Sequence, residues 1–285
     1  MTVRVSSAAG VLYIVPTPIG NLADMVPRAI EVLQTVDLIA AEDTRHSGKL
    51  MQHFQISTPM ISYHDFSSEQ KAQDLLDRLK AGKNIALISD AGTPLISDPG
   101  YRLVSAAREE GINVIPIPGA CAAIAALSAS GLPSDRFAFE GFPPAKNSAR
   151  RAFYQALVQD SRTLIFYESP HRIQASLADL LEVFGPERRM VMAREISKTF
   201  ETFLSGTISS VLAIVEQDPD QQKGEIVLLV AGYQPPEQQE ELSPEACRVM
   251  SLLLDEKLPV KQAASLAAAI TGEKKNRLYD WALTR

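Results

Sequence analysis

Residues 85–100 read IALISDAGTPLISDPG and join a short apolar run to a long loop without basic residues. The run Ile85–Ser89 has the length and the β-branched content of a buried strand. The loop that follows contains glycines and prolines together with two aspartates, Asp90 and Asp98. Glycine lets a ligand approach the backbone closely, and proline fixes the path of the chain. We therefore predict a strand whose carboxyl end opens into a ligand-binding loop.

The same pattern, an apolar run followed by a glycine-containing or polar loop, recurs along residues 1–233. The expected strands are Val11–Val15, Leu38–Ala41, Met60–Tyr63, Ile85–Ser89, Ile112–Pro116, Phe137–Phe142, Thr163–Tyr167, Met190–Ala193, Thr202–Ser205 and Ile226–Tyr233. Helical periodicity lies between them, as in Gln70–Lys80 and His171–Phe184. In the first half, this alternation predicts a largely parallel sheet covered by helices. We predict two α/β domains, at residues 1–118 and 119–233.

The C-terminal part has a different pattern. Residues 234–241 are rich in proline, glutamine and glutamate and are expected to form a linker. A helical extension at 242–285 follows, with helices at Pro244–Glu256, Val260–Ile270 and Lys274–Thr284, of which the last two resemble a helix-turn-helix. The chain carries a net charge of −6, but residues 257–285 hold six basic and two acidic residues, so this segment carries +4 and the rest −10. A basic extension on an acidic body predicts an RNA contact, with packing or dimerisation as the alternative.

Composition excludes several classes of protein. Hydrophobic residues make up 46% and charged residues 22%, which is typical of a globular protein with a core. Cys121 and Cys247 stand far apart and the four histidines have no metal-ligand spacing, so we predict neither a disulfide nor a metal site. The chain has no apolar run as long as those of signal peptides or membrane-spanning helices, which predicts a cytoplasmic protein without membrane contact. Motifs of dinucleotide sites, phosphate-binding loops and serine hydrolases are also missing.

Seven motifs together resemble the small-subunit ribosomal RNA 2′-O-ribose methyltransferases of the tetrapyrrole-methylase superfamily. They are PTPIGNL at 16–22, AEDTR at 41–45, SDAGTP at 89–94 with SDPG at 97–100, FYESPHR at 166–172, ARE at 193–195, KGE at 223–225 and KKN at 274–276. The resemblance extends over residues 11–285. It implies the two-domain class III methyltransferase fold, with S-adenosylmethionine in the cleft between the domains. It also implies a homodimer that methylates a cytidine ribose in the decoding region of 16S RNA, within the small ribosomal subunit.

The resemblance also assigns residues to the site. The cofactor contacts it implies are Pro18, Gly92, Thr93, Pro94, Ile96, Gly119, Ala120, Cys121, Ala122, Tyr167, Glu168, Glu195 and Gly224. A ribose hydroxyl is a weak nucleophile, so a carboxylate that accepts its proton would speed the transfer. We expect that catalytic base among Glu42, Asp43 and Glu168. The basic residues expected to hold RNA are Arg45, His171, Arg172, Arg194, Lys198, Lys274, Lys275 and Arg277.

Two other functions are compatible with the same motifs. The first is a small-molecule methylase of the superfamily, and the second is a ribosome-associated RNA-binding protein without catalysis. Small-molecule members commonly have Gly-Asp-Pro where this chain has Gly92–Pro94, and a glycine-rich first loop where it has Pro16–Gly20. The first alternative predicts no role for the basic extension, and the second predicts no binding of S-adenosylmethionine.

Overall fold

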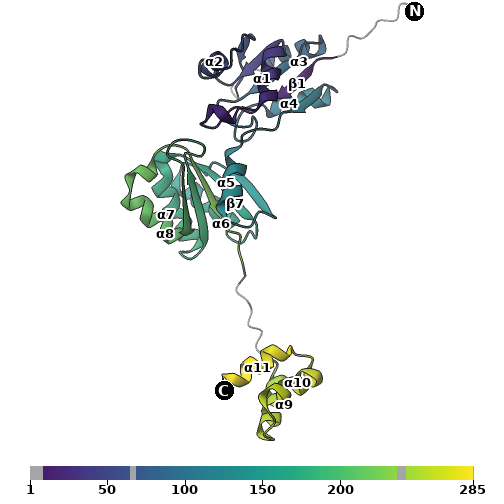
Figure 1. Ribbon diagram of the computed structural model, residues 1–285, viewed down its shortest axis with the longest axis vertical. Helices are drawn as coiled ribbons and strands as arrows, with labels where there is room; N and C mark the ends of the chain where they lie inside the picture. The colour runs from purple at the N-terminus through teal and green to yellow at the C-terminus, as the bar shows by residue number, and fades with distance from the viewer. Residues whose placement is uncertain (1–8, 65–68, 236–241, 285) are drawn as a thin grey trace, which may run out of the picture. The chain divides into compact units, whose positions relative to one another are not determined.

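The computed structural model describes residues 9–64, 69–235 and 242–284, which belong to two compact units (Figure 1). Among these residues, the first unit, up to Tyr233, contains two five-stranded sheets, and the second unit, from Gln234, contains helices alone. The expected linker at 234–241 lies largely outside the described residues. A search of the described helices finds no segment of the length and apolarity that crossing a membrane requires.

The first sheet is parallel throughout, as the sequence predicts. It contains β1 (Val11–Ile14), β2 (Leu38–Ala41), β3 (Met60–Ser62), β4 (Ile85–Ile88) and β5 (Asn113–Pro116), in the order β3-β2-β4-β1-β5. One face packs on α1 (Pro27–Thr35) and α2 (Thr44–His53), and the other on α3 (Glu69–Lys80) and α4 (Tyr101–Glu109). Helices on both faces explain why β2 and β4 are apolar at every position. Because all the strands run the same way, the loops after them meet at one edge.

The second sheet is mixed. It contains β6 (Phe137–Gly141), β7 (Thr163–Glu168), β8 (Arg189–Arg194), β9 (Thr202–Thr207) and β10 (Ile226–Val230), in the order β6-β7-β10-β8-β9. Strands β6 and β7 are parallel, whereas β10 runs antiparallel to both β7 and β8. The amino end of β10 therefore lies at the carboxyl ends of its two neighbours, which brings residues 223–225 to the same edge as Glu168 and Arg194.

The two faces of the second sheet are covered unequally. Helices α6 (Asn147–Leu157), α7 (Ile173–Phe184) and α8 (Ile208–Gln217) pack on one face, around Tyr154, Phe166 and Leu228. Helix α5 (Ala122–Ser130) packs on the other, through Ala123, Ala126 and Leu127. The predicted domain boundary near residue 118 lies in the connection between β5 and α5, inside the first compact unit.

The second unit contains α9 (Pro244–Asp255), α10 (Val260–Thr271) and α11 (Lys275–Leu283). Its small core holds Ala246, Met250, Ala263, Ala264, Ala267 and Leu278, with Trp281 packed against it. Gly272 ends α10 with a φ of +76°, a left-handed conformation that glycine adopts without strain. These helices match the three expected from the sequence to within one or two residues, and α10 and α11 are joined by the turn at Gly272.

Candidate cofactor and substrate site

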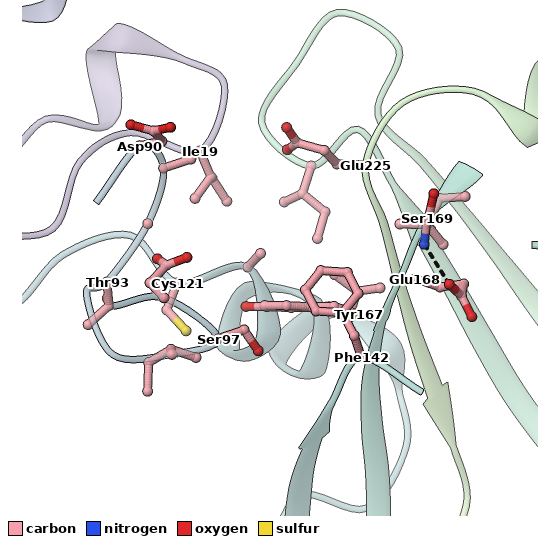
Figure 2. A pocket seen from close by; sticks show the side chains of 18 of the residues that line it. Ile19, Asp90, Thr93, Ser97, Cys121, Phe142, Tyr167, Glu168, Ser169 and Glu225 are labelled. Atoms are coloured by element: carbon pink, nitrogen blue, oxygen red, sulfur yellow. Dashed lines mark hydrogen bonds between the residues drawn. The ribbon is translucent and has the colours of Figure 1, made fainter. Parts of the chain in front are cut away.

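A cavity of about 400 Å³ lies where loops from the two sheets come together (Figure 2). The first sheet contributes Ile19, Glu42, Asp90, Ala91, Gly92, Thr93, Ile96, Ser97 and Asp98. The start of α5 adds Cys121 and Ala122, and the second sheet adds Phe142, Tyr167, Glu168, Ser169, Pro170, Ile196, Gly224, Glu225, Ile226 and Val227. The wall therefore combines apolar side chains with carboxylates, which suits a small organic ligand that carries positive charge.

The loop after β4 is held close to the first loop and to α5. Gly92 and Thr17 exchange two backbone hydrogen bonds, at 2.9 and 3.0 Å, and the Thr93 hydroxyl donates to the Ala120 carbonyl at 2.8 Å. Gly92 has a φ of +83°, and a Cβ there would lie 3.4 Å from Cγ2 of Ile19. A larger residue at position 92 would therefore be strained and would also narrow the cavity.

Tyr167 fixes the first turn of α5 beside the cavity. Its hydroxyl accepts a hydrogen bond from the backbone N–H of Ala123 at 3.1 Å. Its ring packs edge-on against Phe139 and Phe142, with centroids 4.8 and 5.6 Å away. Burial raises the pKa of Tyr167 above its ordinary value, so the hydroxyl keeps its proton at neutral pH. Tyr167 thus serves as a neutral wall residue and anchor.

Glu42 and Asp90 connect the ends of β2 and β4 at the cavity. The backbone N–H of Asp90 donates to Oε2 of Glu42 at 3.3 Å, and the N–H of Asp43 donates to Oδ1 of Asp90 at 3.2 Å. Both carboxylates line the cavity. Asp43 has a different role, because its carboxylate caps α2 and pairs with Arg45 at 2.9 Å. Among the three candidate bases, Glu42 is the one whose position suits a proton acceptor.

Glu168 lies on the opposite face of the second sheet from Tyr167, because neighbouring side chains of a strand alternate. Its Oε1 accepts from the backbone N–H of Ser169 at 2.7 Å and pairs with Arg172 at 2.9 Å. The side chain is 0% exposed, and Figure 2 shows it directed away from the Tyr167 ring. Glu168 belongs to the cavity wall because it stands at the end of β7. Its carboxylate, however, is paired with Arg172. This placement favours a structural role over that of a base.

The loop after β8 brings a partly buried ion pair to the edge of the site. The Lys198 ammonium contacts Oε1 of Glu195 at 2.8 Å and Oε2 of Glu225 at 3.2 Å. Burial alone would raise the pKa of Glu195, but hydrogen bonds from Lys198 and from the Glu225 N–H bring that pKa below its ordinary value. Gly224 has a φ of +81°, and a Cβ there would lie 2.3 Å from the Glu195 carboxylate, so a larger residue would be strained and would displace Glu195. Glu195 supports the loop and is outside the cavity lining.

The structure brings together many, but not all, of the predicted cofactor residues. Those lining the 400 Å³ cavity are Gly92, Thr93, Ile96, Cys121, Ala122, Tyr167, Glu168 and Gly224, with Glu42 beside them. Those outside its lining are Pro18, Pro94, Gly119, Ala120 and Glu195. Sequence reasoning missed Ile19, Asp90, Ala91, Ser97, Asp98, Phe142, Ser169, Pro170, Ile196, Glu225, Ile226 and Val227. The two aspartates could have been found as the charged residues of an otherwise uncharged loop.

The predicted RNA-binding residues differ in how available they are. Arg45, His171, Lys274 and Lys275 are exposed. Arg172 pairs with Glu168, Lys198 with Glu195, and Arg277 with Glu273 at 2.9 Å. Arg194 is buried and donates to Gln221 and Thr202, at 3.3 and 3.2 Å. Arg194 therefore makes its hydrogen bonds within the protein interior, and the four exposed residues are better placed to contact phosphates.

No group of metal-ligating side chains that could hold an ion occurs in the described part of the chain.

The fold and the cavity define a class of methylases. Residues 11–212 match the family model of the tetrapyrrole (corrin/porphyrin) methylases. The chain superposes on uroporphyrin-III C-methyltransferase from Thermus thermophilus with a TM-score of 0.55 at 21% identity, covering 78% of this chain and 94% of that one. It superposes on a diphthine synthase with a TM-score of 0.57 at 14% identity, covering 78% and 90%. These likenesses show the shared fold.

Closer relatives define the branch. Residues 240–285 match the model of the RsmI C-terminal HTH domain. The chain is 57% identical over 278 residues to ribosomal RNA small subunit methyltransferase I of Pseudomonas aeruginosa, a match that spans 98% of both proteins. It is 56% identical over 277 residues to the protein of that name from Escherichia coli O157:H7, over 97% of this chain and 96% of the other. The chain therefore belongs to the ribosomal RNA small subunit methyltransferase I family of tetrapyrrole methylases, and it is an S-adenosylmethionine-dependent methyltransferase.

Proposed function

We propose that this protein transfers the methyl group of S-adenosylmethionine to the 2′-hydroxyl of a cytidine in the decoding region of 16S ribosomal RNA. The observation that carries the proposal is the 400 Å³ cavity at the strand ends, in a chain that matches a small-subunit RNA methyltransferase over 98% of its length. That relative's name specifies ribosomal RNA of the small subunit. The resemblance of the loop motifs supports the ribose position and the cytidine as parts of this proposal.

The cavity fits the cofactor chemically. S-adenosylmethionine carries a positive sulfonium and an ammonium, and the described lining contains the carboxylates of Glu42, Asp90, Asp98 and Glu225 but no lysine or arginine. Ile19, Ile96, Phe142 and Val227 offer apolar surface for an adenine ring and a thioether. When bound, the cofactor supplies an electrophilic methyl group, whose bond to sulfur breaks as the bond to the ribose oxygen forms. These carboxylates and apolar side chains would hold the cofactor in the in-line geometry that this displacement needs.

Glu42 is the residue we assign to proton transfer. The ribose hydroxyl loses a proton as its oxygen becomes bonded to the methyl carbon, and a carboxylate at the cavity wall can take that proton. Oε2 of Glu42 accepts a hydrogen bond from the Asp90 N–H at 3.3 Å, which orients the group toward the end of β4. Its position between the two sheets supports this role better than the positions of Asp43 and Glu168.

The second unit is proposed to hold the RNA, with Lys274 and Lys275 on its surface as phosphate contacts.

A homodimer is proposed as well. Its support is that α5 is the one helix that packs on this face of the second sheet among the described residues, and that Ile124 on α5 and Phe137 on β6 are both exposed. Exposed apolar side chains like these would be covered by contact with another chain. We expect the enzyme to act in the cytoplasm, where its substrate would be the small ribosomal subunit.

Nucleoside mass spectrometry of 16S RNA tests the proposal. RNA from cells that lack the protein should have one 2′-O-methylcytidine fewer than RNA from the parent strain, and the wild-type gene should restore it. A Glu42→Gln gene should not restore it. Unchanged 16S RNA, combined with the loss of a methylated small molecule, would instead support the small-molecule alternative.

A further inference from the structure

A second cavity of about 350 Å³ adjoins the first. It is lined by Thr17, Pro18, Ile19, Gly20, Leu22, His46, Ser47, Lys49, Leu50, Ser89, Asp90, Ala91, Lys198 and Glu225. Ile19, Asp90, Ala91 and Glu225 line both cavities. A ligand in the second cavity would therefore share a wall with a ligand in the first, which is the arrangement that a transfer between two bound molecules requires.

Ser47 gives this cavity a polar group without a partner. The residue is 2% exposed, and its hydroxyl has no hydrogen-bond partner among the described residues. Nearly all buried polar side chains in native proteins are hydrogen-bonded, because a buried hydroxyl without a partner loses the hydrogen bonds that it would make to water. Helix α2 fixes the position of Ser47, since its backbone N–H donates to the Asp43 carbonyl at 3.0 Å. The unused hydroxyl indicates a ligand that supplies the missing hydrogen bond.

Basic side chains flank the same cavity. His46 and Lys49 of α2 line it and are exposed, and Arg45, in the same turn, is 89% exposed. Neither His46 nor Lys49 takes part in an ion pair in the part of the chain that the structure describes. Lys198, from the loop after β8, also lines this cavity but is already paired with Glu195 and Glu225. Basic side chains around a small cavity suit a ligand that is joined to phosphates.

We propose that the second cavity receives the ribose and base of the target nucleotide, turned out of the RNA, while Arg45 and Lys49 hold the adjoining phosphates. The ribose would face the shared wall at Asp90 and Ala91, and the Ser47 hydroxyl would bond to the base or the ribose. A volume near 350 Å³ is at the low end for small-molecule sites, which suits one nucleoside and not a macrocycle. This inference rests on the proposed function and names the substrate subsite of that reaction.

The test measures two quantities on the full-length protein: the affinity for S-adenosylmethionine by calorimetry, and single-turnover methylation of small ribosomal subunits. Ser47→Leu fills the cavity and should slow methylation about 100-fold, the loss expected from a misplaced nucleophile, while cofactor affinity stays within about threefold. Lys49→Glu should slow methylation about tenfold at low salt and limiting subunit concentration, because it weakens subunit binding, again with normal cofactor affinity. Arg78→Glu, the same kind of charge reversal on the exposed end of α3, is the control and should change neither quantity.

Wild-type methylation rates in both Ser47→Leu and Lys49→Glu would overturn the inference, and so would a loss that comes entirely from weaker cofactor binding. If Ser47→Leu does not fold, Ser47→Ala, which removes the hydroxyl alone, and Lys49→Glu decide the question by the same two measurements. A failure of the proposed function is distinguishable, because then the wild-type protein itself would place no methyl group on a cytidine ribose of the subunit.

Discussion

The hydroxyl of Tyr167 accepts a hydrogen bond from the backbone N–H of Ala123 at 3.1 Å, which ties the end of β7 to the first turn of α5. Cys121, at the N-cap position of α5, makes no capping bond with its own side chain. Tyr167, which is 44 positions from Ala123 in the sequence, therefore accepts a hydrogen bond from one of the N–H groups that have no partner within the helix at its start. The bond holds together two walls of the cavity that we assign to the cofactor.

Removing this bond should weaken cofactor binding. Tyr167→Phe should lower the free energy of unfolding by about 1 kcal/mol, the typical contribution of one hydrogen bond, and reduce the affinity for S-adenosylmethionine several-fold. Tyr154→Phe is a matched control, because the Tyr154 hydroxyl bonds to Ser176 at 2.7 Å on the other face of the same sheet. Calorimetry and thermal unfolding measure both effects. Equal losses of affinity in the two variants would show that the Tyr167 bond has no special link to the cofactor.

Gly92→Val should abolish cofactor binding while the protein stays folded. The added side chain would start 3.4 Å from Ile19 and would project where the loop meets the cavity, and valine is also strained at a φ of +83°. Gly111→Val separates the two effects, because Gly111 has a φ of +72° but nothing within 4 Å of a Cβ. The control should lose stability and keep its affinity for S-adenosylmethionine. Normal binding by Gly92→Val would remove this loop from the cofactor site.

The binding loop could be predicted from the sequence, whereas the direction of some side chains could not. An apolar run followed by glycines, prolines and aspartates is a local property of residues 85–100, so it is visible without the fold. Tyr167 and Glu168 are neighbours in one motif, and only the register of β7 determines which of them faces the cavity. Glu225 precedes its strand, and it reaches the site because β10 runs antiparallel to β7 and β8. Strand direction in the second half has no comparable local signal.

Glu42 and Glu168 should respond differently to the same substitution. Glu42→Gln should lower the rate of methyl transfer by about 10²–10⁴-fold, the usual contribution of a general base, with little change in cofactor affinity. Glu168→Gln should mainly lower the melting temperature, because it weakens the ion pair between the fully buried Glu168 carboxylate and the partly exposed Arg172. Single-turnover rates and thermal unfolding provide the two measurements. A fully active Glu42→Gln protein would move the proton acceptor elsewhere, and Asp90 would be the next carboxylate to examine.

The Asp43–Arg45 pair gives a prediction about pH. Hydrogen bonds from the Arg45 guanidinium and backbone lower the pKa of Asp43 from 3.8 to about 2. Because the pKa of Asp43 is lower in the folded protein than in the unfolded chain, the ionised carboxylate stabilises the folded state at pH values above the unfolded-state pKa. This stabilisation is lost as the pH falls from about 4 toward 2. Carbon-detected NMR should show the Asp43 carboxyl titrating near 2 in the wild type and closer to 3.8 in Arg45→Ala. Equal midpoints in the two proteins would mean that the ion pair does not form in solution.

Substitutions in the C-terminal unit should weaken RNA binding and leave cofactor binding unchanged. Lys274 and Lys275 are exposed, so the double substitution to glutamate should weaken binding of small subunits, most strongly at low salt. Each lost phosphate contact should also flatten the dependence of log affinity on log salt by roughly one unit. Arg277 should contribute less, because it pairs with Glu273. Arg248→Glu, on an exposed position of α9, is the control. An unchanged salt dependence in the double variant would favour a packing or dimerisation role for this unit.

The central claim is that this chain methylates a cytidine ribose of the small-subunit RNA. The most direct measurement incubates the purified protein with small ribosomal subunits from cells that lack it and with S-adenosylmethionine labelled in the methyl group, and then identifies the labelled nucleoside by mass spectrometry. We predict about one label per subunit, recovered as 2′-O-methylcytidine from the decoding region and absent with the Glu42→Gln protein. Label on a base, or no label in the RNA of any subunit preparation, would contradict the account.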